Sequence, residues 1–376
     1  MDTRDTNREA TSFISSEPAR DAGILGVPTS LDVQRETISD VEAAPLPSQT
    51  PSVKKEEKIK TPLQDSLRRL RRDKRAMLSL TIIVLFIVIP IIGPFIYQHI
   101  GGQIVDSLSG KRIGPAVYHS PFIQRLDHQD ENPSVTNWLG TDSIGRDTLA
   151  RLMQGMLISL FVALSVEVVN IVLGILVGVS AGFFGGWIDQ FLARFTDIMF
   201  AFPGLLFVIL VAGIFGNALD GPLSAIPVIG ANGNARLLIV SIALAFVSWP
   251  LMARFVRGQT LQLKEQQFIE AARTSGTNNI RIIRKHIIPN LFNIVVVAAT
   301  LDIANTVIGE AGLSFLGLGV STPGSSIGLM ISEASGLTDV HPIEVLIPAI
   351  TLTIVVLAFS FLGDGLRDAF DPRAKD

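Results

Sequence analysis

The chain has 376 residues, of which 48% are hydrophobic and 17% are charged, and its formal net charge is −3. Several long, uninterrupted apolar runs exclude an ordinary soluble enzyme and indicate an all-α membrane protein. The chain has no cysteine, which excludes disulfides and cysteine-based metal sites, and its five histidines are too scattered to suggest a metal cluster. No motif points to nucleic acid.

Residues 1–65 are rich in Ser, Thr, Pro, Asp and Glu, lack the apolar core of a signal peptide, and predict a disordered cytoplasmic tail. Residues 66–97 predict a basic cytoplasmic lead-in and the first transmembrane helix, because a cluster of Arg and Lys between Arg68 and Arg75 directly precedes an apolar run. The cluster could instead recognise anionic lipid or nucleic acid, but orientation of the span is the simpler explanation. It places the amino terminus inside.

Residues 98–154 are polar and predict an extracellular or periplasmic loop. Within the loop, residues 138–147 place two aspartates around an arginine, next to glycines. This pattern favours a tight turn closed by its own Asp and Arg side chains over direct contact with a substrate.

Residues 155–365 predict a core domain with five further spans, and residues 366–376 predict a second cytoplasmic tail. The spans are expected at 156–184, 203–216, 237–256, 287–309 and 343–362, with an outer loop at 217–236. In the first of these, Gly174, Gly178 and Gly182 recur every four residues, which favours close packing of two helices in lipid.

Three carboxylates interrupt or end these apolar runs, namely Glu167, Asp302 and Glu310. An ionisable group at membrane depth faces the interior of the bundle or an aqueous path. Glu167 is equally consistent with a neutral, hydrogen-bonded side chain between helices. The three are therefore candidate path or packing residues.

A polar, basic segment at 259–289 separates the fourth and fifth spans. Its first part predicts a short helix, the coupling helix discussed below, at about 259–276, because it lacks Pro, ends at Gly276 and is rich in Gln, Glu, Leu and Ala. Thr277 or Asn278 would cap a second helix, which Pro289 kinks or breaks. The second helix is expected to place Ile280, Ile283 and Ile287 on one face.

The tripeptide Glu270-Ala271-Ala272, with Gly276 and Pro289 at fixed offsets, resembles the EAA signature of the membrane subunits of ABC importers. In that family the short helix docks into a groove on the ATP-binding subunit. The resemblance implies that Glu270 pairs with a basic group there, that the alanines allow close docking, and that Gly276 and Pro289 fix the turn and the start of the fifth span. An ordinary basic loop is the plainer alternative.

A second stretch in the outer loop is similar to the GTDxxGRD element of the C-type permeases of the dipeptide and oligopeptide importers (DppC/OppC type). It consists of Gly140, Thr141, Asp142, Gly145, Arg146 and Asp147. Segments 197–203 and 310–319 are also similar to that family, and the latter predicts a partly irregular, re-entrant piece. The chain departs from the family at His286 and Ile288, and at 325–328, where the family commonly has Pro-Ser-Trp-Gly.

The resemblance covers residues 68–372 and implies the type I ABC importer permease fold, with six transmembrane helices and both termini cytoplasmic. It implies a subunit of the bacterial or archaeal cytoplasmic membrane that forms half of a path for dipeptides or oligopeptides. The implied partners are a homologous B-type permease, two ATP-binding subunits that hold ATP and Mg, an external binding protein and the bilayer. The chain itself is expected to carry no cofactor, metal or catalytic residue, and so to be no enzyme.

Two alternatives stay open. Nickel chelates or another small solute could replace peptides, because specificity in this family resides largely in the binding protein. An ion-coupled secondary transporter would use the three carboxylates, although the sequence shows no clear internal repeat. A purely structural membrane protein is disfavoured by the coupling element.

Overall fold

The computed structural model of the chain describes residues 62–106, 110–224 and 235–370. Most of the predicted amino-terminal tail and the end of the predicted carboxyl-terminal tail lie outside these ranges. Most of the described residues are helical, and the described parts of 98–147 are largely turns and irregular structure. Their paired strands form one short antiparallel hairpin, in which β1 (Ile104–Val105) pairs with β2 (Arg112–Ile113).

Among the described residues, five helices are long and apolar enough to cross a membrane, and one bent pair would make a sixth. The five are α2 (Lys74–Tyr97), α4 (Thr148–Phe184), α7 (Ala235–Lys264), α10 (Ile288–Phe315) with the helical turns that precede it, and α12 (Pro342–Phe370). The bent pair is α5 (Gly186–Ala201) and α6 (Gly204–Ser224), which meet at an angle of 73°. The predicted class, an all-α protein with several apolar spans, is confirmed.

The helices run further than the apolar runs alone suggest. α4 begins at Thr148, and α6 continues to Ser224 through part of the predicted outer loop. α10 continues to Phe315, so the segment 310–319 is irregular only after its first turn and a half. That helix ends where Gly317 takes a φ of 75° and the amides of Gly317 and Leu318 bond back to Ser314 and Leu313.

The most extensive contact between two helices joins α4 to α7, and the three regularly spaced glycines lie along it. A Cβ on Gly178 would lie 2.6 Å from the carbonyl oxygen of Ala253, and one on Gly182 would lie 2.9 Å from that of Arg257. No larger residue fits there without moving the α7 backbone. The packing role predicted for these glycines is confirmed.

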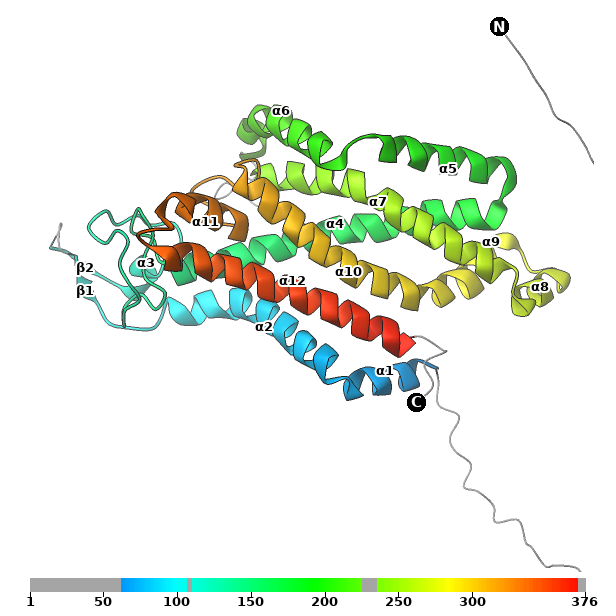
Figure 1. Cartoon of the computed structure of the whole chain (residues 1–376), viewed down its shortest axis with the longest axis horizontal. Helices are drawn as coiled ribbons and strands as arrows, with labels where there is room; N and C mark the ends of the chain where they lie inside the picture. The colour runs from blue at the N-terminus through cyan, green and yellow to red at the C-terminus, as the bar shows by residue number, and fades with distance from the viewer. Residues whose placement is uncertain (1–61, 107–109, 225–234, 371–376) are drawn as a thin grey trace, which may run out of the picture. The chain divides into compact units, whose positions relative to one another are not determined.

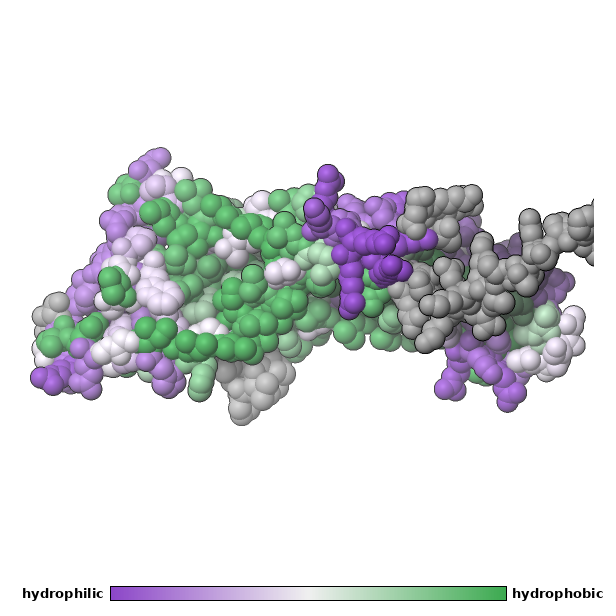
Figure 2. Space-filling view, turned by 90° about the horizontal axis from the view of Figure 1, so that it is seen from below, coloured by the Kyte–Doolittle hydropathy of each residue, from purple (hydrophilic) through white to green (hydrophobic). Residues whose placement is uncertain are grey.

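The short elements gather at the two ends of the long helices (Figure 1). One end carries the hairpin, α3 (Pro115–Tyr118), α11 (Ile327–Ala334) and the 3-10 turn η3 (Ser335–Leu337). The other carries α1 (Pro62–Arg72), α8 (Gln267–Thr274), α9 (Asn279–Ile282) and the π-helical turn η2 (Ile283–Ile287). Figure 2 shows a broad hydrophobic surface between hydrophilic ends, the pattern of a protein whose middle lies in lipid.

Candidate functional site

The predicted coupling helix is shorter than expected: it is α8 (Gln267–Thr274), because residues 259–264 continue α7 and a turn at Glu265–Gln266 separates the two helices. The end of α8 is set by a local hydrogen-bond motif. Gly276 has a φ of 74°, in the left-handed region that glycine adopts without strain. Its amide bonds to the carbonyl of Arg273 at 2.9 Å, and the amide of Thr277 bonds to that of Ala272 at 3.1 Å. These two bonds form a Schellman cap, so Gly276 ends the helix as predicted.

One face of α8 is fixed to the long helices and the other is open. Ile269 is fully buried in a cluster with residues of α4, α7 and α10, and Ala272 packs against the same cluster. Glu270 and Ala271 are exposed, and Glu270 forms no ion pair with any described residue. The exposed edge of α8 therefore carries Glu270 and Ala271, and the buried side fixes the helix to α4, α7 and α10.

The segment after Gly276 differs in part from its prediction. The side chain of Asn278 accepts a hydrogen bond from the amide of Ile280 at 3.2 Å and caps the new helix. Ile280 is 62% exposed, whereas Ile282 and Ile287 are fully buried, so the predicted apolar face is wrong at its first residue. The π-helical turn η2 is wider than an α-helical turn and brings residues five apart onto one side.

Pro289 stands in the first turn of α10, where the lack of an amide proton is tolerated. Helical structure runs from Asn279 to Phe315 as one candidate span, with η2 immediately before the proline. The predicted second helix is thus the beginning of the fifth span. Only the turn at Ser275–Asn278 separates α8 from this continuous helical segment.

At the opposite end, the predicted Asp–Arg turn is part of a larger network of buried charges. Asp142 accepts hydrogen bonds from Arg146 Nε at 2.7 Å and from Arg151 at 2.6 Å. Both arginines also donate to Glu333 of α11, at 2.8 and 2.6 Å. Each arginine is only 2% exposed, whereas Glu333 is partly exposed, so the four charges tie the loop, α4 and α11 together at a largely buried site.

The last aspartate of the element begins α4. Asp147 accepts a hydrogen bond from the amide of Ala150 at 2.8 Å, which caps the helix, and further bonds from Tyr97 at 3.0 Å and Asn137 at 2.6 Å. Gly145 has a φ of 77°, and any Cβ there would overlap the carbonyl oxygen of Arg125. The conformation of this turn therefore requires glycine.

The remaining residues of the element pack the same turn. Thr141 pairs with Asp147 in an isolated antiparallel bridge, and its hydroxyl accepts from the amide of Glu131 at 2.9 Å. A Cβ on Gly140 would overlap the carbonyl oxygen of Glu131. All six predicted residues thus serve the turn and its anchorage.

The segment that departs from the family near Ile327 is built into the core. Ile327 is fully buried in the main hydrophobic cluster, and the hydroxyl of Ser326 accepts from the amide of Leu329 at 3.2 Å to cap α11. The position where the family commonly has Trp is here filled by an aliphatic side chain.

The structure brings two of the three intramembrane carboxylates together. Asn170 of α4 is fully buried and donates to Asp302 of α10 at 2.8 Å and to Glu167 at 3.5 Å, and Ser248 of α7 donates to its amide oxygen at 2.9 Å. The third carboxylate, Glu310, is separate, fully buried, and accepts from Ser159 and Ser314 at 2.6 and 2.7 Å. Glu310 is therefore buried in the contact between α4 and α10.

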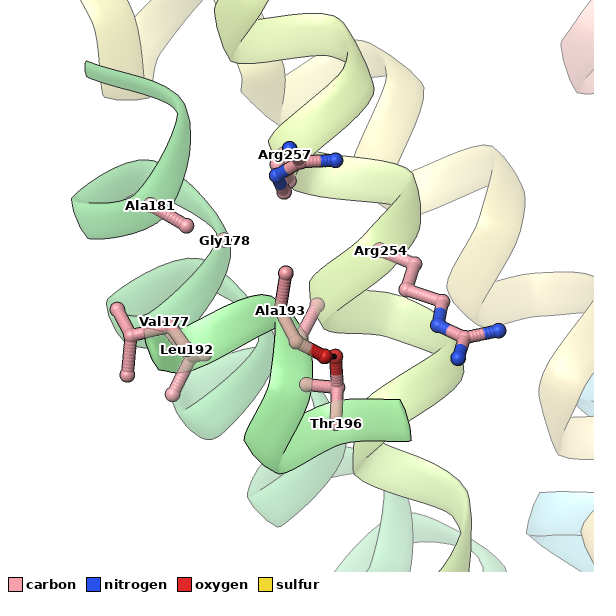
Figure 3. Close-up of a pocket in the computed structure, with 9 residues that line it drawn as sticks. Val177, Gly178, Ala181, Leu192, Ala193, Thr196, Arg254 and Arg257 are labelled. Atoms are coloured by element: carbon pink, nitrogen blue, oxygen red, sulfur yellow. Dashed lines mark hydrogen bonds between the residues drawn. The ribbon is translucent and has the colours of Figure 1, made fainter. Parts of the chain in front are cut away.

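A shallow pocket lies between α4, α5 and α7 (Figure 3). Small and apolar residues line most of it, and two arginines of α7 stand at its edge. Arg257 donates to both oxygens of Asp189, at 2.5 and 2.7 Å, and Arg254 donates to Asp197 at 2.5 Å. Because these cations are already paired with α5, the pocket is a packing gap beside a clasp of ion pairs rather than a ligand site.

One group in the outer loop has side chains of metal-binding type. Ligand atoms of Asp106, Asp127 and His128 lie within 4.8 Å of one another, and Glu131 holds the other ring nitrogen of His128 at 2.6 Å. The three residues are partly exposed, and acidic groups of this kind are common on protein surfaces without an ion. No function is assigned to this group.

Comparison with known proteins decides the family. Residues 174–376, more than half of the chain, match the family model of the binding-protein-dependent transport system inner membrane component. The chain belongs to this family. Residues 61–107 of the permease also match the N-terminal transmembrane domain of oligopeptide transport permease C.

The permease has curated relatives of similar length. It is 37% identical over 321 residues to the glutathione transport system permease protein GsiD of Shigella flexneri serotype 5b, covering 85% of this chain and 94% of that protein. It is 36% identical over the same extent to GsiD of Escherichia coli O6:K15:H31. A chain of the MetNI methionine ABC transporter, solved facing inward, matches 58% of the permease and 96% of its own length with a TM-score of 0.45 and 21% identity.

The permease is therefore a multi-pass membrane subunit of an ABC importer, as the two sequence motifs indicated. The predicted DppC/OppC type is confirmed. Membership of this family sets aside the ion-coupled secondary transporter.

Proposed function

We propose that the permease forms half of the translocation path for short peptides in an importer, and that one of the two ATP-binding subunits of this importer docks on α8. The observation that carries this proposal is the exposed edge of Glu270 and Ala271, mounted on a helix that buried Ile269 fixes to the bundle. A motor that moves this edge moves α7 before it and α10 after it. No catalytic group on this chain is needed for that work.

The orientation follows from charge. With α5 and α6 counted as one bent span, six spans put both ends of the chain on the side of α8, and the type I importer fold has this arrangement. Arg68 and its neighbours and the basic residues around α8 then lie in the cytoplasm, as the positive-inside rule expects. The network of Arg146, Arg151 and Glu333 lies outside, where an external binding protein delivers its ligand.

The path is proposed to run along α10, between this chain and a homologous B-type permease. Asp302 is only partly buried, and Asn305, one turn further on, is exposed in the single chain. Polar side chains at membrane depth are unfavourable against lipid, so this face turns toward the second permease or toward water. Glu167 supports Asp302 from behind through Asn170.

Peptides are the first substrate class because the curated relatives are named for glutathione transport, and glutathione is a small peptide. Nickel chelates are the second. ATP and Mg would bind to the two ATP-binding subunits. These subunits would switch the permease pair between its inward-open and outward-open conformations by stabilising one conformation over the other.

Uptake by the complete complex in liposomes, with its own binding protein, tests the proposal. Labelled glutathione, a dipeptide and a nickel chelate are offered in turn, with and without ATP and with a protonophore. We expect ATP-dependent peptide uptake that the protonophore leaves unchanged. If only the nickel chelate is taken up, nickel chelates and not peptides are the substrate class. Peptide uptake in the absence of ATP would overturn the ATP-driven mechanism.

A further inference from the structure

The helix α1 is separate from the first span although it directly precedes it. Asp73 has an extended conformation, with φ −77° and ψ 107°, and its side chain accepts from the amide of Arg75 at 2.8 Å to cap α2. The cap starts a new helix at this point. The chain therefore turns between α1 and α2, as Figure 1 shows.

One side of α1 is fixed to the end of the bundle. Leu70 is 8% exposed and packs in a small cluster with Ala76 at the start of α2 and Ala369 near the end of α12. Leu366 packs against the same cluster. The orientation of α1 is thus set by both the first and the last span, and its other side faces outward.

The outward side is rich in unpaired positive charge. Five cations of α1 and the start of α2 are exposed and form no ion pair with any described residue, namely Arg68, Arg71, Arg72, Lys74 and Arg75. The exposed acids near the end of α12, Asp364 and Asp368, form no ion pair with these five cations. Leu67 lies among the cations and is 51% exposed.

This basic side directly adjoins the apolar surface of the spans. Figure 2 shows a strongly hydrophilic patch beside the broad hydrophobic surface, where α1 meets α2. A charged group at that boundary lies at the level of lipid headgroups, because the apolar surface marks the hydrocarbon region.

We propose that α1 is an interfacial helix that binds the phosphate groups of anionic phospholipids. Guanidinium groups form paired hydrogen bonds with phosphate, and each basic residue near an anionic surface adds to the attraction. Leu67 would reach into the upper acyl region, as apolar residues of interfacial helices do. If the basic residues only oriented the first span, net positive charge would be enough. Lipid binding by α1 makes a further prediction, that anionic phospholipids are enriched around this helix.

The test measures the lipid composition next to α1 in the complete complex. Because this chain has no cysteine, Leu67→Cys offers one site for a fluorescent dye when the partner subunits are also cysteine-free. Nanodiscs hold equal amounts of phosphatidylglycerol and phosphatidylcholine, with bromine on only one of them. We expect brominated phosphatidylglycerol to quench the dye about threefold or more strongly than brominated phosphatidylcholine, and rising salt to reduce the difference.

Three variants show whether the arginines are responsible. Replacing Arg68, Arg71 and Arg72 by Gln should bring the two lipids to near parity, whereas replacing them by Lys should keep the preference. Lys74 and Arg75 stay in place to hold the orientation of α2. Arg112→Gln, an exposed change on β2, should have no effect.

Several results would overturn the proposal. They are equal quenching by both lipids in the parent protein, a preference that the Gln replacements or salt leave unchanged, and a dye that neither lipid quenches. Binding of a labelled oligonucleotide that the Gln replacements abolish would assign the basic side to nucleic acid instead.

Discussion

Arg146 and Arg151 are almost fully buried, and each forms ion pairs with the same two carboxylates, those of Asp142 and Glu333. Two cations and two anions are tolerated at a largely buried site because each charged group is paired with a group of opposite charge. Removing one partner leaves a buried charge without compensation, which costs about 3–5 kcal/mol. The network is therefore sensitive to any single neutral replacement.

We predict that Asp142→Asn lowers the stability of the purified complex by about 3 kcal/mol, because both arginines lose one of the two anions they share and only Glu333 remains. The change should appear as a lower midpoint of thermal unfolding in detergent. Asp339→Asn is the matched control, since Asp339 is an exposed acid at the same end and should change stability by less than about 0.5 kcal/mol. Equal midpoints for the two variants would show that the network contributes little.

At this scale the sequence predicted only contacts between near neighbours. The pairing of Asp142 with Arg146 follows from four residues of spacing, but Glu333 lies 182 residues from Arg151 in the chain. Likewise Asn170 and Asp302 are 132 residues apart. Nothing in the local pattern connects such residues, because the packing of distant helices decides which of them meet.

Among the elements, α8 combines a fixed side with an exposed edge, and the exposed edge is where we expect the ATP-binding subunit. Glu270→Lys reverses the one acidic charge of that edge, and Ala271→Phe adds a ring where close approach is needed. Neither change touches Ile269, which anchors the helix.

We predict that each variant inserts normally but loses ATP-dependent uptake by about tenfold, while ATP hydrolysis continues, because the motor no longer moves the spans. Uptake and hydrolysis are measured on the same liposomes. Asp339→Lys reverses an exposed charge at the opposite end and should leave both rates unchanged. Normal uptake by both α8 variants would refute docking at this edge.

The ends of elements were predictable wherever a local motif sets them. Gly276 ends α8, as predicted, through bonds that involve only neighbouring residues. Asp147 caps α4 in the same local way, but the span was predicted to begin only at Met156, because the apolar run begins there. The π-helical turn before Pro289 was not predictable, because its buried side is chosen by contacts with α4 and α7. The bend between α5 and α6 is marked only by Pro203.

For the whole molecule, apolar runs and basic flanks were enough to predict the class and the approximate spans. The number of spans depends on whether the bent pair crosses the membrane, which composition alone does not decide. The absence of cysteine from the chain offers a direct way to determine it.

We predict that single cysteines at Glu270 and at Asp339 react with a membrane-impermeant maleimide from opposite sides. In sealed vesicles with the outer surface exposed, Asp339→Cys should be labelled and Glu270→Cys protected until the membrane is permeabilised. Gly213→Cys, in the apolar α6, serves as a position that reacts slowly from either side. Arg112→Cys, exposed in the loop after α2, distinguishes six spans from five, because the bent pair lies between it and Asp339. Six spans place Arg112→Cys and Asp339→Cys on the same side, so labelling of these two positions from opposite sides would contradict six spans.

The length of α4 has a further consequence. At 37 residues it measures about 55 Å, nearly twice the hydrocarbon thickness of about 30 Å, and its glycine contacts hold it against α7. A stiff rod of this length behaves as a lever. A tilt of only about 5° displaces one tip by about 5 Å relative to the other, so a slight push at the α8 end is enough to shift the network of Asp142, Arg146 and Arg151 at the far end.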